Sequence, residues 1–136
     1  MRLACACAVA LTAALLLGGC GGVTAADLFL VQRSGGGQPL TLLVNEEGGV
    51  RCNGRAAPKL GDPQLIEARS IQEDMRDPAS KHIALPAAPG SVFSYRERQE
   101  SGAVSFADNS GGQPKVFRRL ALFVLQTAQR VCHLPG

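Results

Sequence analysis

Apolar and polar residues alternate over several short stretches of the chain, and this period of two predicts β-strands. In residues 40–45 (LTLLVN), Leu40, Leu42 and Val44 fall on one face. Runs of Gly, Ser, Asn and Pro separate these stretches, as expected where turns connect strands. The predicted strands cover residues 27–33, 40–45, 50–52, 91–99 and 103–107, and residues 53–61 are predicted to form a loop.

A helical spacing of three and four residues replaces this alternation in the middle of the chain. The first predicted helix begins at Asp62-Pro63, because Asp is a good N-cap and Pro suits the first turn. It is predicted to end at Asp77, since Pro78 follows, and residues 78–90 are expected to be irregular. Its apolar face consists of Leu65, Ala68, Ile71 and Met75.

The second predicted helix begins at Pro114, runs to about Cys132 and has two faces of opposite polarity. Its broad apolar arc is expected to face the sheet. The opposite arc is either a membrane-facing basic surface or an ordinary solvated face, and its cations are Lys115, Arg118, Arg119 and Arg130. The apolar arc contains Val116, Phe117, Leu120, Ala121, Phe123, Val124, Leu125, Ala128, Val131 and Cys132.

The order of the predicted elements is strands, helix, strands, helix, and it indicates an α+β domain. We expect a small antiparallel sheet, made of a meander and a hairpin, with both helices packed on one of its faces. Residues 27–136 have the length of a single domain of this kind.

The N-terminal residues have the features of a bacterial lipoprotein signal. Arg2 precedes an uncharged apolar run from Leu3 to Leu17, which is shorter than the ~20 residues of a typical transmembrane helix. Leu17-Gly18-Gly19-Cys20 resembles the lipobox of bacterial lipoproteins. That resemblance implies cleavage before Cys20, acylation of this residue with lipids such as palmitate, and attachment to the extracytoplasmic face of a cell membrane.

This interpretation divides the chain into a signal peptide (1–19), a lipidated Cys20 with a short tether (20–26) and the domain (27–136). Residues 21–26 reach at most ~20 Å when extended, so the domain is expected close to the membrane surface. Two alternatives remain open, namely ordinary secretory cleavage near Val23-Thr24-Ala25-Ala26 and an uncleaved anchor helix.

Three of the five cysteines fall within residues 1–20. Cys52 and Cys132 remain, and the oxidising compartment of an exported protein favours a disulfide between them. The alternative is a pair of buried free thiols. The two histidines, His82 and His133, show no zinc-ligand spacing with these cysteines, so no metal site is predicted.

Composition argues against nucleic-acid binding. The formal net charge of +3 falls to +2 when Arg2 is removed with the signal, and this is far from a basic nucleic-acid-binding domain. The chain has no Trp and one Tyr, so it lacks a platform on which bases could stack.

No pattern in the sequence indicates catalysis or a cofactor. Ser34 precedes Gly35 to Gly37 but belongs to neither a nucleophile elbow nor a P-loop. His82 lies in a proline-bounded loop, where a solvated histidine is the ordinary case. Asp108-Asn109-Ser110 offers oxygen ligands for calcium, but the EF-hand spacing is absent and an Asx turn is preferred. The chain is therefore expected not to be an enzyme.

Arg96 and Arg98 share one face of their predicted strand with Val92 and Ser94. They form either an anion-binding patch or the polar side of a half-exposed sheet.

A wider resemblance covers most of residues 28–132. The Arg33-Ser34-Gly35-Gly36 turn, the helix beginning at Asp62, the Val92-Phe93-Ser94-Tyr95 strand and the closing helix resemble the layout of emfourin-type inhibitors of thermolysin-like metalloproteases. The resemblance supports an α+β fold and raises the hypothesis of a protease inhibitor. The lipobox and the cysteine pair depart from that family, whose members look cytoplasmic, so no inhibitory residue is carried over.

The sequence therefore predicts a lipid-anchored, extracytoplasmic, non-catalytic binding domain of the bacterial cell envelope, with a protein or envelope component as its partner. The alternative is an emfourin-like protease inhibitor that inserts a loop, Ser34 to Pro39 or Asp108 to Gln113, into a protease cleft.

Overall fold

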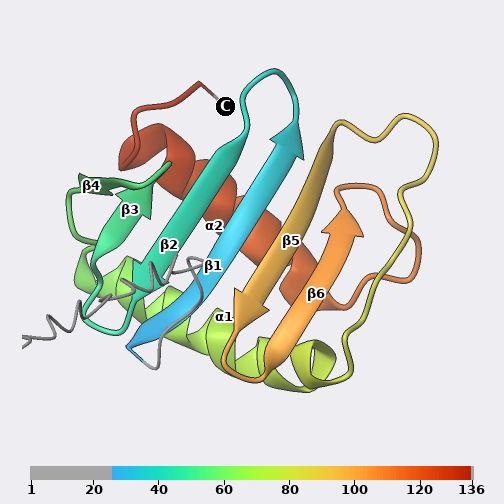
Figure 1. Ribbon diagram of the computed structural model, residues 1–136, viewed down its shortest axis with the longest axis horizontal. Helices are drawn as coiled ribbons and strands as arrows, with labels where there is room; N and C mark the ends of the chain where they lie inside the picture. The colour runs from blue at the N-terminus through green and yellow to red at the C-terminus, as the bar shows by residue number, and fades with distance from the viewer. Residues whose placement is uncertain (1–25, 136) are drawn as a thin grey trace, which may run out of the picture.

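The computed structural model describes residues 26–135, and within them six antiparallel strands form one sheet with two helices across a single face (Figure 1). The strand order is β4-β3-β2-β1-β5-β6, so the first strand of the domain lies near the middle of the sheet. The predicted α+β class is confirmed. The strands are β1 (Asp27–Gly35), β2 (Leu40–Asn45), β3 (Val50–Cys52), β4 (Arg55–Ala57), β5 (Phe93–Gln99) and β6 (Gly102–Ala107), and the helices are α1 (Asp62–Ser80) and α2 (Lys115–Arg130).

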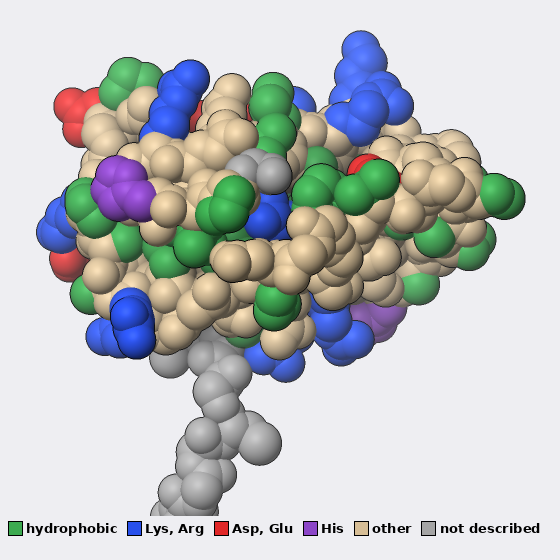
Figure 2. Space-filling view, turned by 90° about the horizontal axis from the view of Figure 1, so that it is seen from above, with side chains coloured by type: hydrophobic (Ala, Val, Ile, Leu, Met, Phe, Trp, Pro, Cys, Tyr) green, Lys and Arg blue, Asp and Glu red, His purple; other side chains and the backbone are tan. Residues whose placement is uncertain are grey.

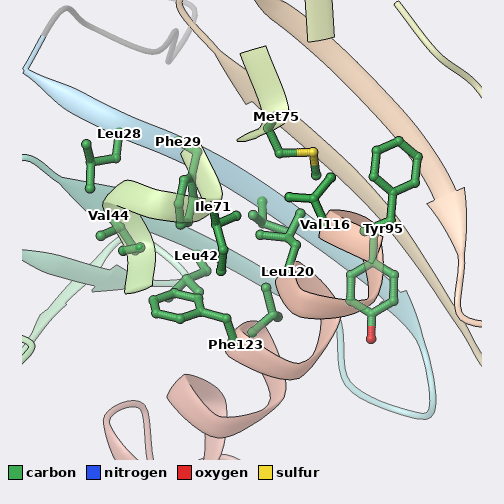
Figure 3. Close-up of a cluster of buried hydrophobic side chains, with 14 of the residues drawn as sticks. Leu28, Phe29, Leu42, Val44, Ile71, Met75, Tyr95, Val116, Leu120 and Phe123 are labelled. Atoms are coloured by element: carbon green, nitrogen blue, oxygen red, sulfur yellow. The ribbon is translucent and has the colours of Figure 1, made fainter. Parts of the chain in front are cut away.

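The helix-covered face of the sheet carries the hydrophobic core. Leu40, Leu42 and Val44 of β2 are fully buried there, which confirms the face predicted from their alternation. A bulge at the start of β1 allows Leu28 and Phe29 to join the core together, although they are neighbours in the chain. Figure 3 shows Leu28, Phe29, Leu42 and Val44 packed among residues of both helices.

The two helices bury the faces that their sequences predicted. α1 buries Ala68, Ile71 and Met75 fully and Leu65 partly. α2 also buries Thr127, which the predicted apolar arc did not include. The members of that arc that are buried in α2 are Val116, Phe117, Leu120, Phe123, Val124 and Ala128. Neither of these helices is long and apolar enough to cross a membrane, and they are the only ones in residues 26–135.

The ends of α1 differ from the prediction. Gly61 is the N-cap, and Asp62 is the first helical residue. At the other end the helix continues beyond Asp77, through Pro78, to Ser80. A proline removes one backbone hydrogen bond within a helix. Because Pro78 and the residue after it are buried, packing keeps the last turn helical in spite of that loss.

Residues 53–61, which were predicted as a loop, contain strand β4. β4 pairs antiparallel with β3, and the two are joined by Asn53-Gly54. Both linking residues have positive φ, 50° for Asn53 and 80° for Gly54, as in the tight turns that favour Asn-Gly. With three residues, β4 is too short to show an alternation of apolar and polar residues. Asn53-Gly54 was therefore the one feature of the sequence that indicated a hairpin of β3 and β4.

The other face of the sheet is not covered by the two helices, and we call it the open face (Figure 1). Cross-strand pairs identify its residues, because directly paired residues of antiparallel strands point to the same side. One row crosses the sheet as Ala56, Arg51, Leu43, Leu30, Arg98 and Ala103, and the next row contains Thr41, Gln32, Arg96 and Ser105.

Candidate functional site

Three loops meet at one end of the sheet, at the top of Figure 1. The register brings them together, because Gly35 at the end of β1 pairs with Phe93 at the start of β5, and Ala107 at the end of β6 pairs with Ser94. We define the loop end as residues 36–39, 86–92 and 108–113. It contains the whole of one segment that the sequence singled out as an insertion loop, Asp108 to Gln113, and most of the other, Ser34 to Pro39.

Asp108 ties the last of these loops to the start of β5. Its carboxylate accepts hydrogen bonds from the hydroxyl of Ser91 at 2.9 Å and from the backbone N–H groups of Val92 at 3.1 Å and Phe93 at 3.2 Å. Burial alone would raise the pKa of this carboxyl, but the hydrogen bonds outweigh burial and hold the pKa below its usual value. The ionised form of Asp108 is therefore the one that stabilises the loop end.

The next two residues extend this connection. The Asn109 side chain accepts a hydrogen bond from the backbone of Ala88 at 3.0 Å and donates to the carbonyl groups of Ala88 and Pro89, both at 3.1 Å. The Ser110 hydroxyl accepts from the backbone N–H of Ala107 at 2.8 Å. The two loops of residues 86–92 and 108–113 thus hold each other in one conformation.

The glycine-rich loop packs directly onto the same unit. A Cβ at Gly35 would overlap the carbonyl of Val92, and a Cβ at Gly36 would overlap the ring of Phe93. Both glycines also have positive φ, 87° and 62°, which side chains disfavour. The Phe93 ring also contacts the buried Arg33, whose guanidinium lies 4.8 Å from the ring centre, within the range of a cation–π contact. All three loops are therefore packed into one surface.

The surface of the loop end is mostly uncharged. Figure 2 looks onto this end, where hydrophobic side chains lie among uncharged polar side chains and backbone, and Lys and Arg lie mainly towards the edges of the view. Val92 is the most prominent apolar residue, with 55% of its surface exposed. Asp108 is the one charged side chain of the loop end, and the core of a protein-binding surface is likewise depleted of charged residues.

The side-chain oxygen atoms of Asp108, Asn109 and Ser110 serve the loop structure through bonds to residues 88–93 and to Ala107. Backbone and hydroxyl groups already donate to them. Within residues 26–135, His, Cys, Asp and Glu form no group of three or more that could hold a metal ion.

Ser34 and His82, the candidates considered for catalysis, lie at opposite ends of the sheet. Ser34 is exposed beside the loop end, where it pairs with Ser94. His82 is exposed near the other end, close to Gly102 at the start of β6. The fold does not bring the two side chains together.

Cys52 and Cys132 form the predicted disulfide, with their Cα atoms 5.8 Å apart. Cys52 is the last residue of β3, and Cys132 follows the end of α2. The bond therefore fastens the C-terminal end of α2 to the short strands at one edge of the sheet.

The four cations predicted on the polar face of α2 are not equivalent. Arg119 bridges to α1. Its guanidinium donates hydrogen bonds to the carboxylates of Glu67 at 3.1 Å and Asp74 at 2.6 Å and to the Ser70 hydroxyl at 2.9 Å. Its charge is thus matched within the protein, and it joins the two helices. The exposed cations of this face are Lys115, Arg118 and Arg130.

Arg96 and Arg98 lie on the open face, as their spacing predicted. Pairing places Arg51 of β3 on the same side, in one row with Arg98. The sequence did not link Arg51 to the other two, because the strand order that brings them onto one surface involves β1 and β2.

Glu97 is a buried acidic residue that no pattern in the sequence singled out. It lies on the core face of β5, fully buried, and within the described residues neither carboxylate oxygen has a hydrogen-bond partner. Burial raises its pKa to about 8. The one indication was indirect, since placing Arg96 and Arg98 on one face puts Glu97 on the other with Tyr95.

No protein-family model, curated protein or solved structure matches this chain. The lipobox, Cys20 and the alternative cleavage site up to Ala25 lie outside the described residues, which begin at Ala26. The function is therefore inferred from the loop end, the disulfide and the sequence of the N-terminal segment.

Proposed function

We propose that this chain is a lipid-anchored, extracytoplasmic, non-catalytic binding domain of the bacterial cell envelope, which engages a protein or envelope component through its loop end. The observation that carries the proposal is the packing of three loops into one hydrogen-bonded, largely uncharged surface. A surface that is already ordered loses little conformational entropy when a partner binds.

The placement of the loop end suits an anchored protein. β1 begins at Asp27, next to the proposed tether, and its nine residues span about 26 Å before they reach the loop end. The tether is shorter than this, at most ~20 Å. A partner at the loop end is thus separated from the point at which the anchor joins the domain. The disulfide agrees with an oxidising compartment outside the cytoplasm.

A photo-crosslinking amino acid at Val92 in the native cell tests this proposal. We expect one discrete adduct from position 92 and none from Leu122, an equally exposed position on α2 (53% against 55%). Asp108→Ala should weaken the adduct, because it frees the segment that carries Val92. An adduct formed at position 122 and not at position 92 would contradict the proposed surface. Intact mass of the membrane-derived protein tests acylation of Cys20 separately.

A protease inhibitor remains the second candidate, because the same loop end offers the rigidity that inhibitory loops require. Purified protein should then slow a secreted thermolysin-like metalloprotease, and Val92→Asp should abolish the effect. The matched control is Leu122→Asp on α2. If no secreted metalloprotease of the host is slowed, this candidate is wrong.

A further inference from the structure

The open face of the sheet has an unusual arrangement of charge and apolar surface. In its longest row, Leu43 and Leu30 lie side by side, with Arg51 beyond one and Arg98 beyond the other. Both leucines are half-buried, and Arg51 is exposed. Arg96 projects from the next row. Two leucines flanked by arginines form an amphipathic surface, on which apolar atoms and cationic groups can both make contacts.

The charge on this face is almost entirely positive. The six strands contain two acidic residues; Glu97 is buried on the core face, and Asp27 lies at the margin of the open face, where it lines a shallow depression with Leu43. Lys59 lines that depression too. In Figure 2 the open face forms the lower edge of the molecule, where several Lys and Arg side chains project.

The helix side of the molecule differs in this respect. α1 has five acidic residues, Asp62, Glu67, Glu73, Asp74 and Asp77, against two arginines. Of the cations on α2, Arg119 is matched by the acids of α1. The exposed cations Lys115, Arg118 and Arg130 of α2 remain on this side. An anionic surface would thus meet side chains of both signs on the helix side and mainly arginines on the open face.

The start of the domain points to the occupant of the open face. Asp27 borders this face, and residues 21–26 connect it to Cys20 across at most ~20 Å. A lipid on Cys20 therefore keeps the open face within reach of the membrane surface.

We infer that the open face docks on the anionic headgroups of the membrane that holds the lipid anchor, with Arg51 and Arg96 contacting lipid phosphates and Leu30 and Leu43 at the headgroup boundary. The inference rests on the proposed anchoring. Guanidinium groups bind phosphate bidentately, and cations near an anionic bilayer are attracted to it. The loop end lies at one end of the strands and not on this face, so docking leaves it accessible to a partner.

The protein lacks Trp, so a single Trp can report which face meets the lipid. We would place Gln32→Trp on the open face and Gln126→Trp on the exposed side of α2, in the processed, acylated protein. Each variant is reconstituted into vesicles of brominated lipid, made either of phosphatidylcholine alone or of equal parts phosphatidylcholine and phosphatidylglycerol. Bromine quenches Trp emission only at close range.

We expect quenching of the reporter at position 32 in the anionic vesicles and not in the neutral ones, and none at position 126. Arg51→Gln with Arg96→Gln should shift the docking equilibrium about thirtyfold and abolish this quenching. The control, Arg118→Gln with Arg130→Gln, should leave it unchanged. Quenching at position 126, or equal quenching at position 32 in both kinds of vesicle, would overturn the inference. Neither result would contradict the acylation of Cys20.

A protein that carries no acyl group would instead refute the proposed anchor. The inference is then decided by sedimentation of the soluble protein with the same vesicles. Sedimentation with the anionic vesicles that depends on Arg51 and Arg96 would support it, and the absence of sedimentation would overturn it.

Discussion

At the residue scale, Glu97 makes the fold sensitive to pH. It pairs with Val31 and Val104 in neighbouring strands, and its buried carboxyl stays protonated up to a pKa of about 8. In the unfolded chain the carboxyl ionises near its usual value of 4.5. The folded state therefore binds more protons between these two values, and its stability falls as the pH rises through this window.

We predict that Glu97→Gln removes most of this pH dependence. The free energy of unfolding of the unsubstituted protein should fall by a few kcal/mol between roughly pH 4.5 and pH 8, and the variant should change far less. Urea denaturation across this range measures the difference. Glu100→Gln, at an exposed turn, is the control and should keep the slope. A flat profile for the unsubstituted protein would show that the Glu97 carboxyl has a partner.

The glycines of the first loop give a second prediction at this scale. Gly36→Ala should destabilise the protein by about 1–3 kcal/mol, because a methyl group overlaps the Phe93 ring and the residue has positive φ. Gly37→Ala is the matched control, since Gly37 also has positive φ but its Cβ would meet no atom within 4 Å. Equal losses in the two variants, measured by thermal or chemical denaturation, would mean that the contact with Phe93 contributes nothing.

At the scale of elements, the hydrogen bonds of Asp108 predict a local effect. Asp108→Ala should increase hydrogen exchange at the amides of Val92 and Phe93, which donate to its carboxylate, and leave the amides of β2 unchanged. Because these bonds lower the pKa of Asp108, they stabilise the folded state above its usual pKa and are lost as the pH falls through the lowered value. Uniform acceleration over the whole sheet would show a global effect instead.

The bridge between the helices predicts a further effect at this scale. Arg119→Gln should cost about 1 kcal/mol, a small value because Arg119 and its two carboxylate partners are partly solvated. The loss should shrink at high salt. Arg118→Gln, on the exposed side of the same helix, should cost less. A double-mutant cycle with Asp74 separates the interaction from the other effects of each substitution.

Most elements could be predicted because local periodicity determines them. β2 was placed correctly from the alternation in LTLLVN, and the buried face of α1 from its spacing of three and four. The errors arose where local rules compete with packing, as at Pro78, which stays helical because it is buried. The loop end and the row from Arg51 to Arg98 required strand order, which connects residues about fifty positions apart and leaves no local pattern.

At the scale of the whole molecule, the disulfide closes a large part of the chain. Eighty positions separate Cys52 from Cys132, and the loss of chain entropy in the unfolded state corresponds to about 4.5 kcal/mol. Reduction, or Cys52→Ala with Cys132→Ala, should lower the free energy of unfolding by roughly this amount at unchanged pH. Denaturation with and without reductant measures it. A loss below about 1 kcal/mol would show that native-state strain offsets the entropic gain.

The disulfide also places the three segments of the loop end differently with respect to the covalent ring that it closes. Residues 86–92 and 108–113 lie within the ring closed by Cys52 and Cys132, whereas residues 36–39 lie outside it. A protease that hydrolyses a peptide bond in either of the first two segments leaves both pieces joined through sulfur, still paired along β5 and β6. A cut within residues 36–39 leaves β1 held by non-covalent contacts alone. The two halves of the loop end thus differ in how well the protein would withstand being nicked there.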